Sequence, residues 1–272
     1  MTAVTHLTLT DRELERQQLS GLWLDGQATI QNESDAIRFV SSVGFALRYD
    51  AKPGLPLAAM FRATGEKRRA IELTNALLAR SKVVETNLIA KRLVLVYADV
   101  VPAVYALRKR SRSLELSSNA MRALELIRKE GHATSGDVRR YLGIVGQDRP
   151  DTADLALEEL QRGMLIDRGP SSVPPKGIPY LSPEGFPYRL SEKAHADLFR
   201  AGDRLKVADA VCFVIETYLR AAVFASPRKL AALFRLLFTE AEMHTAIRAM
   251  THSKKLRLTD KYILQLPPEP LN

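Results

Sequence analysis

Cysteine is nearly absent from this chain, which has a single one, Cys212, among its 272 residues. One thiol cannot form an intrachain disulfide, so disulfide-stabilised secreted scaffolds are excluded and a reducing cytoplasm is favoured. Long uncharged apolar runs are also lacking. The longest run, residues 207–225, is interrupted by three charged residues (Asp209, Glu216 and Arg220), which is too much charge for a membrane span. The N-terminus has no signal-peptide pattern, so we expect a cytoplasmic protein without membrane contacts.

Signatures of metal and cofactor chemistry are lacking as well. The five histidines have no His-x-x-x-His or Cys-rich spacing; they are His6, His132, His195, His244 and His252. The chain has no glycine-rich phosphate loop and no Gly-x-Ser-x-Gly elbow. The pattern therefore predicts no metal site and no cofactor.

Positive charge is what the chain has in excess. Forty Lys and Arg residues stand against 31 Asp and Glu residues, a formal net charge of +9. Neutralising phosphates releases condensed counterions, so this balance favours a polyanionic partner. A generally basic surface without such a partner is the alternative.

One order of elements, namely helix, short helix, longer helix and strand or hairpin, recurs in three stretches. The last copy is the clearest, with helices predicted over 207–225, 228–234 and 239–252 and strands over 255–258 and 262–266. Ser226 and Pro227 form a helix start signal, and Thr239 with Glu242 forms a capping box. This order is that of a winged helix. The predicted fold class is therefore mainly α with short β-hairpins, as three tandem winged-helix (helix-turn-helix) modules.

The other two copies follow the same scheme. The middle copy has predicted helices over 119–129, 134–142 and 151–163 and strands over 164–167 and 186–190. The first copy has predicted helices over 34–43, 57–62 and 66–80 and strands over 83–87 and 92–97. The Pro- and Gly-rich segment 171–187 predicts a long mobile wing. We predict separate modules rather than one large core, with an N-terminal arm at 1–31 and modules at 32–112, 113–203 and 204–272. Trp23 is expected to anchor the arm.

Basic side chains on the third helix of a winged helix are the expected contacts to DNA, because that helix enters the major groove while the wing follows the backbone. The predicted DNA-binding residues of the third module are Lys229, Arg248, His252, Lys254 and Lys255. Those of the other modules are Lys67, Arg68, Arg139 and Arg140.

The third helix of the middle module contradicts this scheme, because residues 151–162 hold four carboxylates and one arginine. Two rows of phosphates would repel such a helix. We expect the middle module to pack against its neighbours or to contact another protein.

Three strings carry a family resemblance: AIRFVSSVGFALRYD, VLVYADVVPAVYAL and ASPRKLAALFRLLFTEAEMHTAIRAM. Together with the order of modules, over most of residues 33–267, they resemble the bacterial winged-helix DNA glycosylases of the AlkZ/YcaQ type, which unhook interstrand crosslinks. The chain is most similar to an uncharacterised glycosylase-related branch of that superfamily. The resemblance implies a role in DNA repair, with double-stranded and damaged DNA as the partner.

The catalytic members of that family carry a Gln-x-Gln or Gln-x-Asp pair shortly after a Gly-aromatic dipeptide. Here the dipeptide is Gly44-Phe45, and the matching positions hold Leu47 and Tyr49. Leucine can neither accept a proton nor orient water, and a lost general base costs about 100- to 10,000-fold in rate. Leu47 and Tyr49 are two apart on a predicted strand, so they are expected on one face.

Two carboxylates near these positions are weak catalytic candidates. Asp50 is one residue out of register, and Asp99 falls where the family has a second polar site. The leading hypothesis is a DNA-binding protein without the catalytic pair. An active DNA glycosylase using a different carboxylate, and a protein-interaction scaffold with a basic surface, remain open alternatives.

Overall fold

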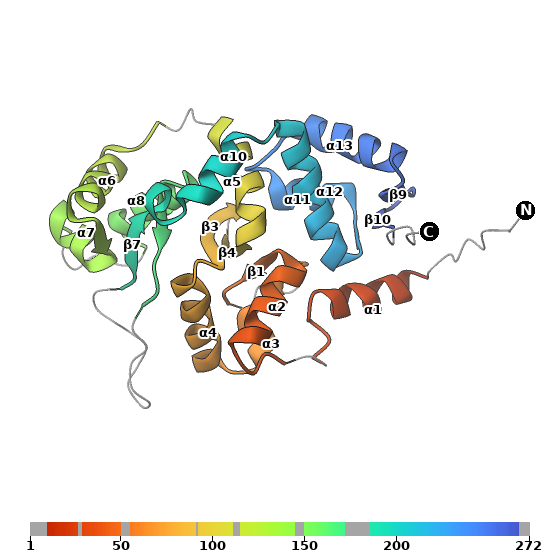
Figure 1. Cartoon of the computed structure of the whole chain (residues 1–272), viewed down its shortest axis with the longest axis horizontal. Helices are drawn as coiled ribbons and strands as arrows, with labels where there is room; N and C mark the ends of the chain where they lie inside the picture. The colour runs from red at the N-terminus through yellow and green to blue at the C-terminus, as the bar shows by residue number, and fades with distance from the viewer. Residues whose placement is uncertain are drawn as a thin grey trace, which may run out of the picture.

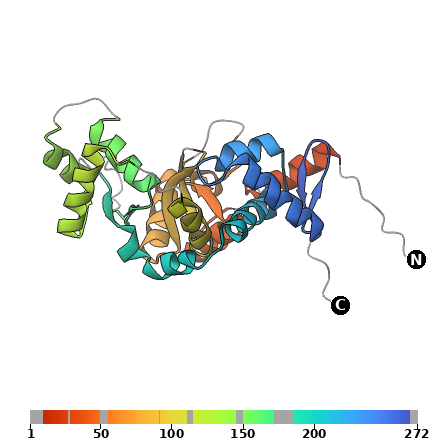
Figure 2. The same cartoon turned by 90° about the horizontal axis from the view of Figure 1, so that it is seen from above.

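The computed structural model describes residues 10–26, 29–49, 55–90, 92–110, 115–144, 150–171 and 185–266, which form a mostly helical protein with three small sheets. Three units follow one another along the chain: the first unit (residues 33–97), the middle unit (118–190) and the third unit (207–265). Both views place the middle unit and the third unit at opposite ends of an elongated molecule, with the first unit between them (Figure 1 and Figure 2). In the described ranges no sheet exceeds four strands.

The first unit is built on a four-stranded sheet. Its elements are α2 (Glu33–Val43), β1 (Phe45–Leu47), β2 (Ala58–Ala59), α3 (Met60–Thr64), α4 (Lys67–Ala79), β3 (Val83–Ile89) and β4 (Arg92–Tyr97). The strand order is β2-β1-β4-β3, with β1 antiparallel to β4 and parallel to the short β2. Sequence periodicity did not indicate β2, because two residues are too few to show alternation.

The middle unit has its own three-stranded sheet, in the order β5-β7-β6. Its elements are α6 (Ser118–Glu130), β5 (His132–Thr134), α7 (Ser135–Leu142), α8 (Thr152–Arg162), β6 (Ile166–Arg168) and β7 (Pro187–Leu190). The predicted start of α7 is confirmed: Thr134 and Asp137 form a reciprocal capping box. Most of the predicted mobile wing, residues 172–184, lies outside the described residues.

The third unit repeats this arrangement with the strand order β8-β10-β9. Its elements are α11 (Val207–Ala222), β8 (Phe224–Ala225), α12 (Pro227–Phe234), α13 (Glu240–His252), β9 (Leu256–Leu258) and β10 (Ile263–Gln265). The predicted helix to residue 225 is wrong at its end. Val223 adopts a φ of +64°, and the next two residues pair with β10. This conformation is costly for a β-branched residue, but the Val223 carbonyl accepts a hydrogen bond from the Gln265 amide (2.9 Å).

All three sheets share the order of three strands, to which the first sheet adds β2. In each unit one strand follows the first helix, a second follows the third helix, and a third is the last strand of the unit. In the sheet the last strand lies between the other two, which gives the orders β1-β4-β3, β5-β7-β6 and β8-β10-β9. The element order predicted from the sequence therefore recurs in space as well as along the chain.

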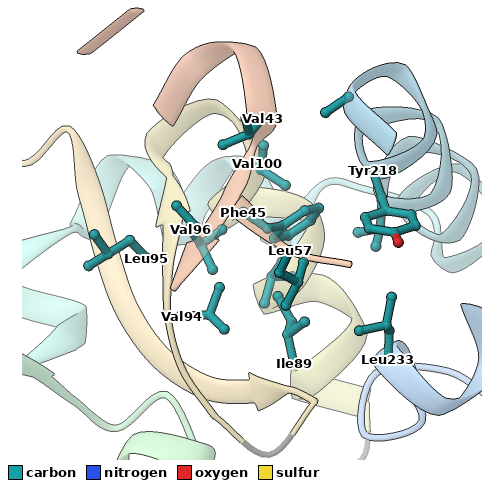
Figure 3. Close-up of a cluster of buried hydrophobic side chains, with 14 of the residues drawn as sticks. Val43, Phe45, Leu57, Ile89, Val94, Leu95, Val96, Val100, Tyr218 and Leu233 are labelled. Atoms are coloured by element: carbon teal, nitrogen blue, oxygen red, sulfur yellow. The ribbon is translucent and has the colours of Figure 1, made fainter. Parts of the chain in front are cut away.

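The hydrophobic core does not divide into three parts. One cluster of buried side chains joins the first and third units, whereas the middle unit has a separate, smaller cluster. In the shared cluster Phe234 packs edge-on against Phe45 and Tyr218, with ring centroids 5.5 Å apart in both pairs. Figure 3 shows Phe45 of the first unit with Tyr218 and Leu233 of the third unit. The Tyr218 hydroxyl donates to the Pro56 carbonyl (3.1 Å). The expectation of separate cores is thus wrong for these two units.

Part of the N-terminal arm is docked on this shared core. Helix α1 (Asp11–Gly21) packs against α11, and the Gln18 side-chain amide donates to the carbonyls of Ala222 (3.1 Å) and Phe224 (2.9 Å). The Trp23 ring lies edge-on against Phe39 at 5.2 Å. Trp23 therefore anchors the arm as predicted, while residues 1–9 lie outside the described ranges.

Helices between the units form a connecting layer. They are η1 (Ala98–Val100), α5 (Val101–Arg110), α9 (Ser191–Ala194) and α10 (Ala196–Asp203). Helix α5 packs against α10 and α11, and Tyr105 stacks on Phe199 with centroids 4.1 Å apart. Within the described ranges no helix has the length and apolarity needed to cross a bilayer, and no three potential metal ligands gather.

Arg110, at the end of α5, binds the N-terminal turn of α13. Its guanidinium donates to the Leu237 carbonyl (3.1 Å) and to the Glu242 carboxylate (2.7 Å). This contact holds the pKa of Glu242 at about 2. Because the folded pKa lies below the unfolded value of about 4.3, the pair contributes stability above pH 4–5, and this contribution is lost as the pH falls toward 2.

We expect Arg110→Ala to lower the free energy of unfolding by about 1 kcal/mol at pH 7, since the pair is partly exposed, and by much less near pH 2.5. Urea unfolding at both pH values measures the difference. The control is Lys109→Ala. Lys109 lies on the same helix as Arg110 and makes a more exposed ion pair with Asp203 of α10, so its loss should have little effect at either pH. An equal loss for Arg110→Ala at both pH values would contradict this assignment.

Candidate functional site

The segment that follows α2 is held at a tight corner. Gly44 ends the helix with a φ of +69°, and a Cβ added there would overlap the Cγ2 methyl group of Thr217 in α11. The Gly44 carbonyl accepts a hydrogen bond from the Tyr97 amide (3.0 Å). Only glycine combines this φ with such a close approach, so the corner fixes where β1 begins.

The two positions expected to match the glycosylase pair differ in their surroundings. Leu47 ends β1 and is 3% exposed, whereas Tyr49 lies in the following bend and is 44% exposed. The prediction that both lie on one face assumed a strand reaching Tyr49, and that strand ends two residues earlier. Neither side chain is an acid or base suited to activating water at neutral pH. Asp99 is exposed in η1, and Asp50 lies outside the described residues.

A buried cluster of charged side chains lies between these positions and the middle unit. Arg48, which separates Leu47 from Tyr49, is 1% exposed, and its Nε lies 3.5 Å from the Glu85 carboxylate in β3. Arg168 in β6 approaches the same carboxylate at 3.0 Å, and the Phe186 ring lies 3.5 Å from its guanidinium. Burial lowers the pKa of Arg48, and Glu85 opposes this effect.

A second buried ion group adjoins the first. Asp167, fully buried beside Arg168, accepts hydrogen bonds from the Arg189 guanidinium (3.1 Å) and the Glu85 amide (3.4 Å). The ring Nε2 of the buried His195 lies 2.8 Å from its Oδ2. Strand β3 of the first unit and strands β6 and β7 of the middle unit are therefore joined by hydrogen-bonded charges rather than by apolar packing alone.

Sequence reasoning missed these two groups, since they come from segments up to about 150 positions apart. The only local signal was a charged residue inside a strand that begins and ends with apolar residues, as with Glu85 in VVETNLI. A buried charge must be paired, so such residues indicate a partner without identifying it.

The acidic third helix of the middle unit, α8, packs against β3 of the first unit. The Asn87 side-chain amide donates to the Glu158 carbonyl (3.2 Å), and the Thr86 hydroxyl donates to the Gln161 carbonyl (3.5 Å). The expectation that this module packs against its neighbours is confirmed, and α8 is not free to enter a groove of DNA on this side.

The acidic side chains of this region have internal partners. Asp151 and Asp154 bind Arg139, Glu158 binds Arg162 (2.5 Å), and Glu159 accepts from the Ser117 amide and hydroxyl. Arg139, a predicted DNA contact, is therefore an internal ion-pair residue with a side chain only 12% exposed. The more exposed Arg140 pairs with Asp137 (2.5 Å).

The predicted contacts of the third unit lie at its surface. Arg248 and His252 are exposed on α13, Lys254 and Lys255 follow the helix, and Lys229 is exposed in the first turn of α12. Lys255 makes a partly exposed ion pair with Glu216 (2.9 Å).

The two predicted contacts of the first unit begin α4. Lys67 is exposed, and Arg68 pairs with Glu72 one turn further on (2.8 Å). The rest of α4 is mostly buried, and the Asn75 side-chain amide donates to the Ser171 carbonyl (2.8 Å), where the described part of the wing ends.

Comparisons with known proteins agree with the architecture. The model of the AlkZ-related family matches residues 30–169. The solved structure of the Streptomyces sahachiroi DNA glycosylase AlkZ is similar to 94% of this chain and 70% of its own, with a TM-score of 0.59 at 12% identity. The comparison with curated proteins gives no match. Because the family model spans half of the chain, including the Gly44 corner, Arg48 and Asp167, this protein belongs to the AlkZ-related family.

Proposed function

We propose that this glycosylase-like protein binds double-stranded DNA through tandem winged-helix modules, with the third unit as the main contact, and that it does so without the catalytic pair of the glycosylases. The shared strand order of the three sheets supports the winged-helix assignment. The family match and the fold of the similar DNA glycosylase support DNA as the partner.

The observation that carries this proposal is the exposed basic stripe of α13. His244, Arg248 and His252 are spaced four residues apart, so they lie along one face of the helix, and all three are exposed. Lys254 and Lys255 extend the stripe beyond the end of the helix. Arg248, Lys254 and Lys255 are the Lys and Arg side chains of this stripe, and Glu240 and Glu242 lie at the opposite end of the helix. These three cations suit a groove flanked by two rows of phosphates.

The corresponding helices of the other units are less suited to this role. Helix α8 carries paired carboxylates and packs on β3, and α4 is mostly buried with cations confined to its first turn. Lys67, Arg68 and Arg140 therefore remain proposed as secondary phosphate contacts. Arg139 is not proposed again, because its guanidinium is held by two carboxylates.

Leu47 and Tyr49 support the proposed loss of the catalytic pair. Glycosidic hydrolysis needs a positioned group that activates water or stabilises the sugar cation, and neither residue supplies one. We expect release of bases from alkylated duplex to stay at the rate of the protein-free control. Faster release would revive the alternative of a glycosylase with a different carboxylate.

The decisive variant is Lys254→Ala/Lys255→Ala. Each lost phosphate contact should reduce the slope of log Kd against log salt by about 0.9, so the double change should reduce it by up to about 1.8. Fluorescence anisotropy with a labelled duplex across a salt series measures the slope.

The matched control is Arg128→Ala/Lys129→Ala, which removes the same charge from two exposed positions of α6 in the middle unit. It should leave the slope nearly unchanged, as should Glu158→Gln in α8. If the α6 and the Lys254/Lys255 variants lose slope equally, binding depends on total charge and α13 is not the main contact.

A protein partner of the middle unit is the second candidate. Its acidic side chains are paired internally, so exposed apolar residues are better placed to bind such a partner; Met121 of α6 and Leu155 of α8 are both more than half exposed. Replacing Met121 and Leu155 together with Ser should abolish a co-purifying complex without changing the DNA salt slope.

A further inference from the structure

The buried charges between the first and middle units do not balance. The two buried guanidiniums of Arg48 and Arg168 share the single carboxylate of Glu85, whereas Asp167 pairs with His195 and with Arg189, whose side chain is 30% exposed. Among the described residues, Glu85 is the one carboxylate within ion-pair distance of Arg48 and of Arg168. An uncompensated buried charge is expensive, so the cluster lacks one negative charge.

The hydrogen-bonding groups show the same deficit. Among the described residues, none of the three side-chain nitrogens of Arg48 makes a hydrogen bond, and neither do Nε and Nη1 of Arg168. The two Glu85 oxygens also lack a hydrogen bond and lie 3.5 Å from Arg48 Nε and 3.0 Å from Arg168 Nη1, but two oxygens are too few for five nitrogens. Arg48 is 1% exposed, so water at the surface does not satisfy these donors. Buried donors without acceptors indicate a group that completes the site.

The surroundings of the two arginines suit a small oxyanion. The Phe186 ring lies 5.2 Å from the Arg48 guanidinium and 3.5 Å from that of Arg168, so both cations are in contact with one aromatic ring. Tyr49, the residue after Arg48, is 44% exposed. Tyr49 thus connects the cluster with the surface at the position where the glycosylases carry a catalytic residue.

We propose that Arg48 and Arg168 form a binding site for a phosphate group between the first and middle units. The planar guanidinium fork matches phosphate oxygens, and two forks supply the unused donors that the cluster contains. The phosphate is either inorganic or the terminal phosphate of a nucleic-acid strand. Nothing in this proposal requires base excision or α13.

Isothermal titration calorimetry of the full chain with inorganic phosphate, at constant ionic strength, tests the site. We expect saturable 1:1 binding, weakened at least tenfold in Arg48→Lys, because lysine keeps the charge but not the fork. Arg108→Lys changes another buried arginine, in α5, outside the cluster, and should bind phosphate like the wild type. If Arg48→Lys does not fold, Arg168→Lys provides the same comparison.

A second titration separates the two sources. A 5′-phosphorylated dinucleotide that binds at least tenfold tighter than inorganic phosphate, and loses this advantage without its 5′-phosphate, identifies a strand end; equal affinities identify free phosphate. No saturable binding of either ligand by the wild type, or equal weakening in the Arg48 and Arg108 variants, would overturn the proposal. Lys254→Ala/Lys255→Ala should bind phosphate normally, so failure of the α13 proposal is seen separately.

Discussion

Gly44→Ala should lower the free energy of unfolding by about 2–4 kcal/mol, one of the largest effects expected from adding a single methyl group to this protein. Two costs combine at this position. An alanine at a φ of +69° is strained by about 1 kcal/mol, and its Cβ would overlap the Cγ2 methyl group of Thr217. Urea unfolding of the purified variant measures the loss.

Two further variants separate these costs. Gly65→Ala places alanine at a φ of +68° with no atom within 4 Å of its Cβ, so it should cost only about 1 kcal/mol. Thr217→Ser removes the methyl group that a Gly44 side chain would meet, and Gly44→Ala/Thr217→Ser should recover most of the difference from Gly65→Ala. If Thr217→Ser gives no recovery, α11 does not pack against this corner, and the shared core of the first and third units is in error.

Asp167→Ala should destabilise the protein by about 3–5 kcal/mol, because it removes the carboxylate that Arg189 and His195 share in a buried position. The stability should fall most at the junction of the first and middle units, where the Glu85 amide also loses its acceptor. Asp197→Ala removes a highly exposed ion pair to Arg200 and should cost less than about 0.5 kcal/mol.

The readout for both aspartate variants is chemical unfolding together with hydrogen exchange. Asp167→Ala should increase amide exchange in β3, β6 and β7 more than in α13. A uniform increase over the whole chain would contradict a junction held by this carboxylate, as would a loss no larger than that of Asp197→Ala.

Much of the secondary structure could be predicted from local signals. Capping residues at Thr134 and Thr239 and the apolar, valine-rich run of β4 are short-range properties, and the elements they predicted are present within one or two residues. The end of α11 could not be predicted, because Val223 reverses the chain only when Gln265 of β10 binds its carbonyl. Helix α5 was missed because it is apolar on most sides and shows little helical periodicity.

Some features of the candidate sites could likewise be predicted from local sequence, and others depend on contacts between distant segments. Exposure of Arg248 and His252 follows from helical spacing, which the sequence shows directly. Two other features depend on contacts between separate segments. Arg139 forms ion pairs with Asp151 and Asp154, and Arg48 and Arg168 both pair with Glu85. A single sequence holds no signal that pairs such charges.

The affinity of the wild-type protein for a duplex of about 20 base pairs, measured between 50 and 300 mM salt, tests the central claim most directly. Binding through the basic stripe of α13 and the residues after it predicts a straight line of log Kd against log salt, with a slope that corresponds to about three to five phosphate contacts. Absence of binding at 50 mM salt, or an affinity that does not change with salt, would contradict the account.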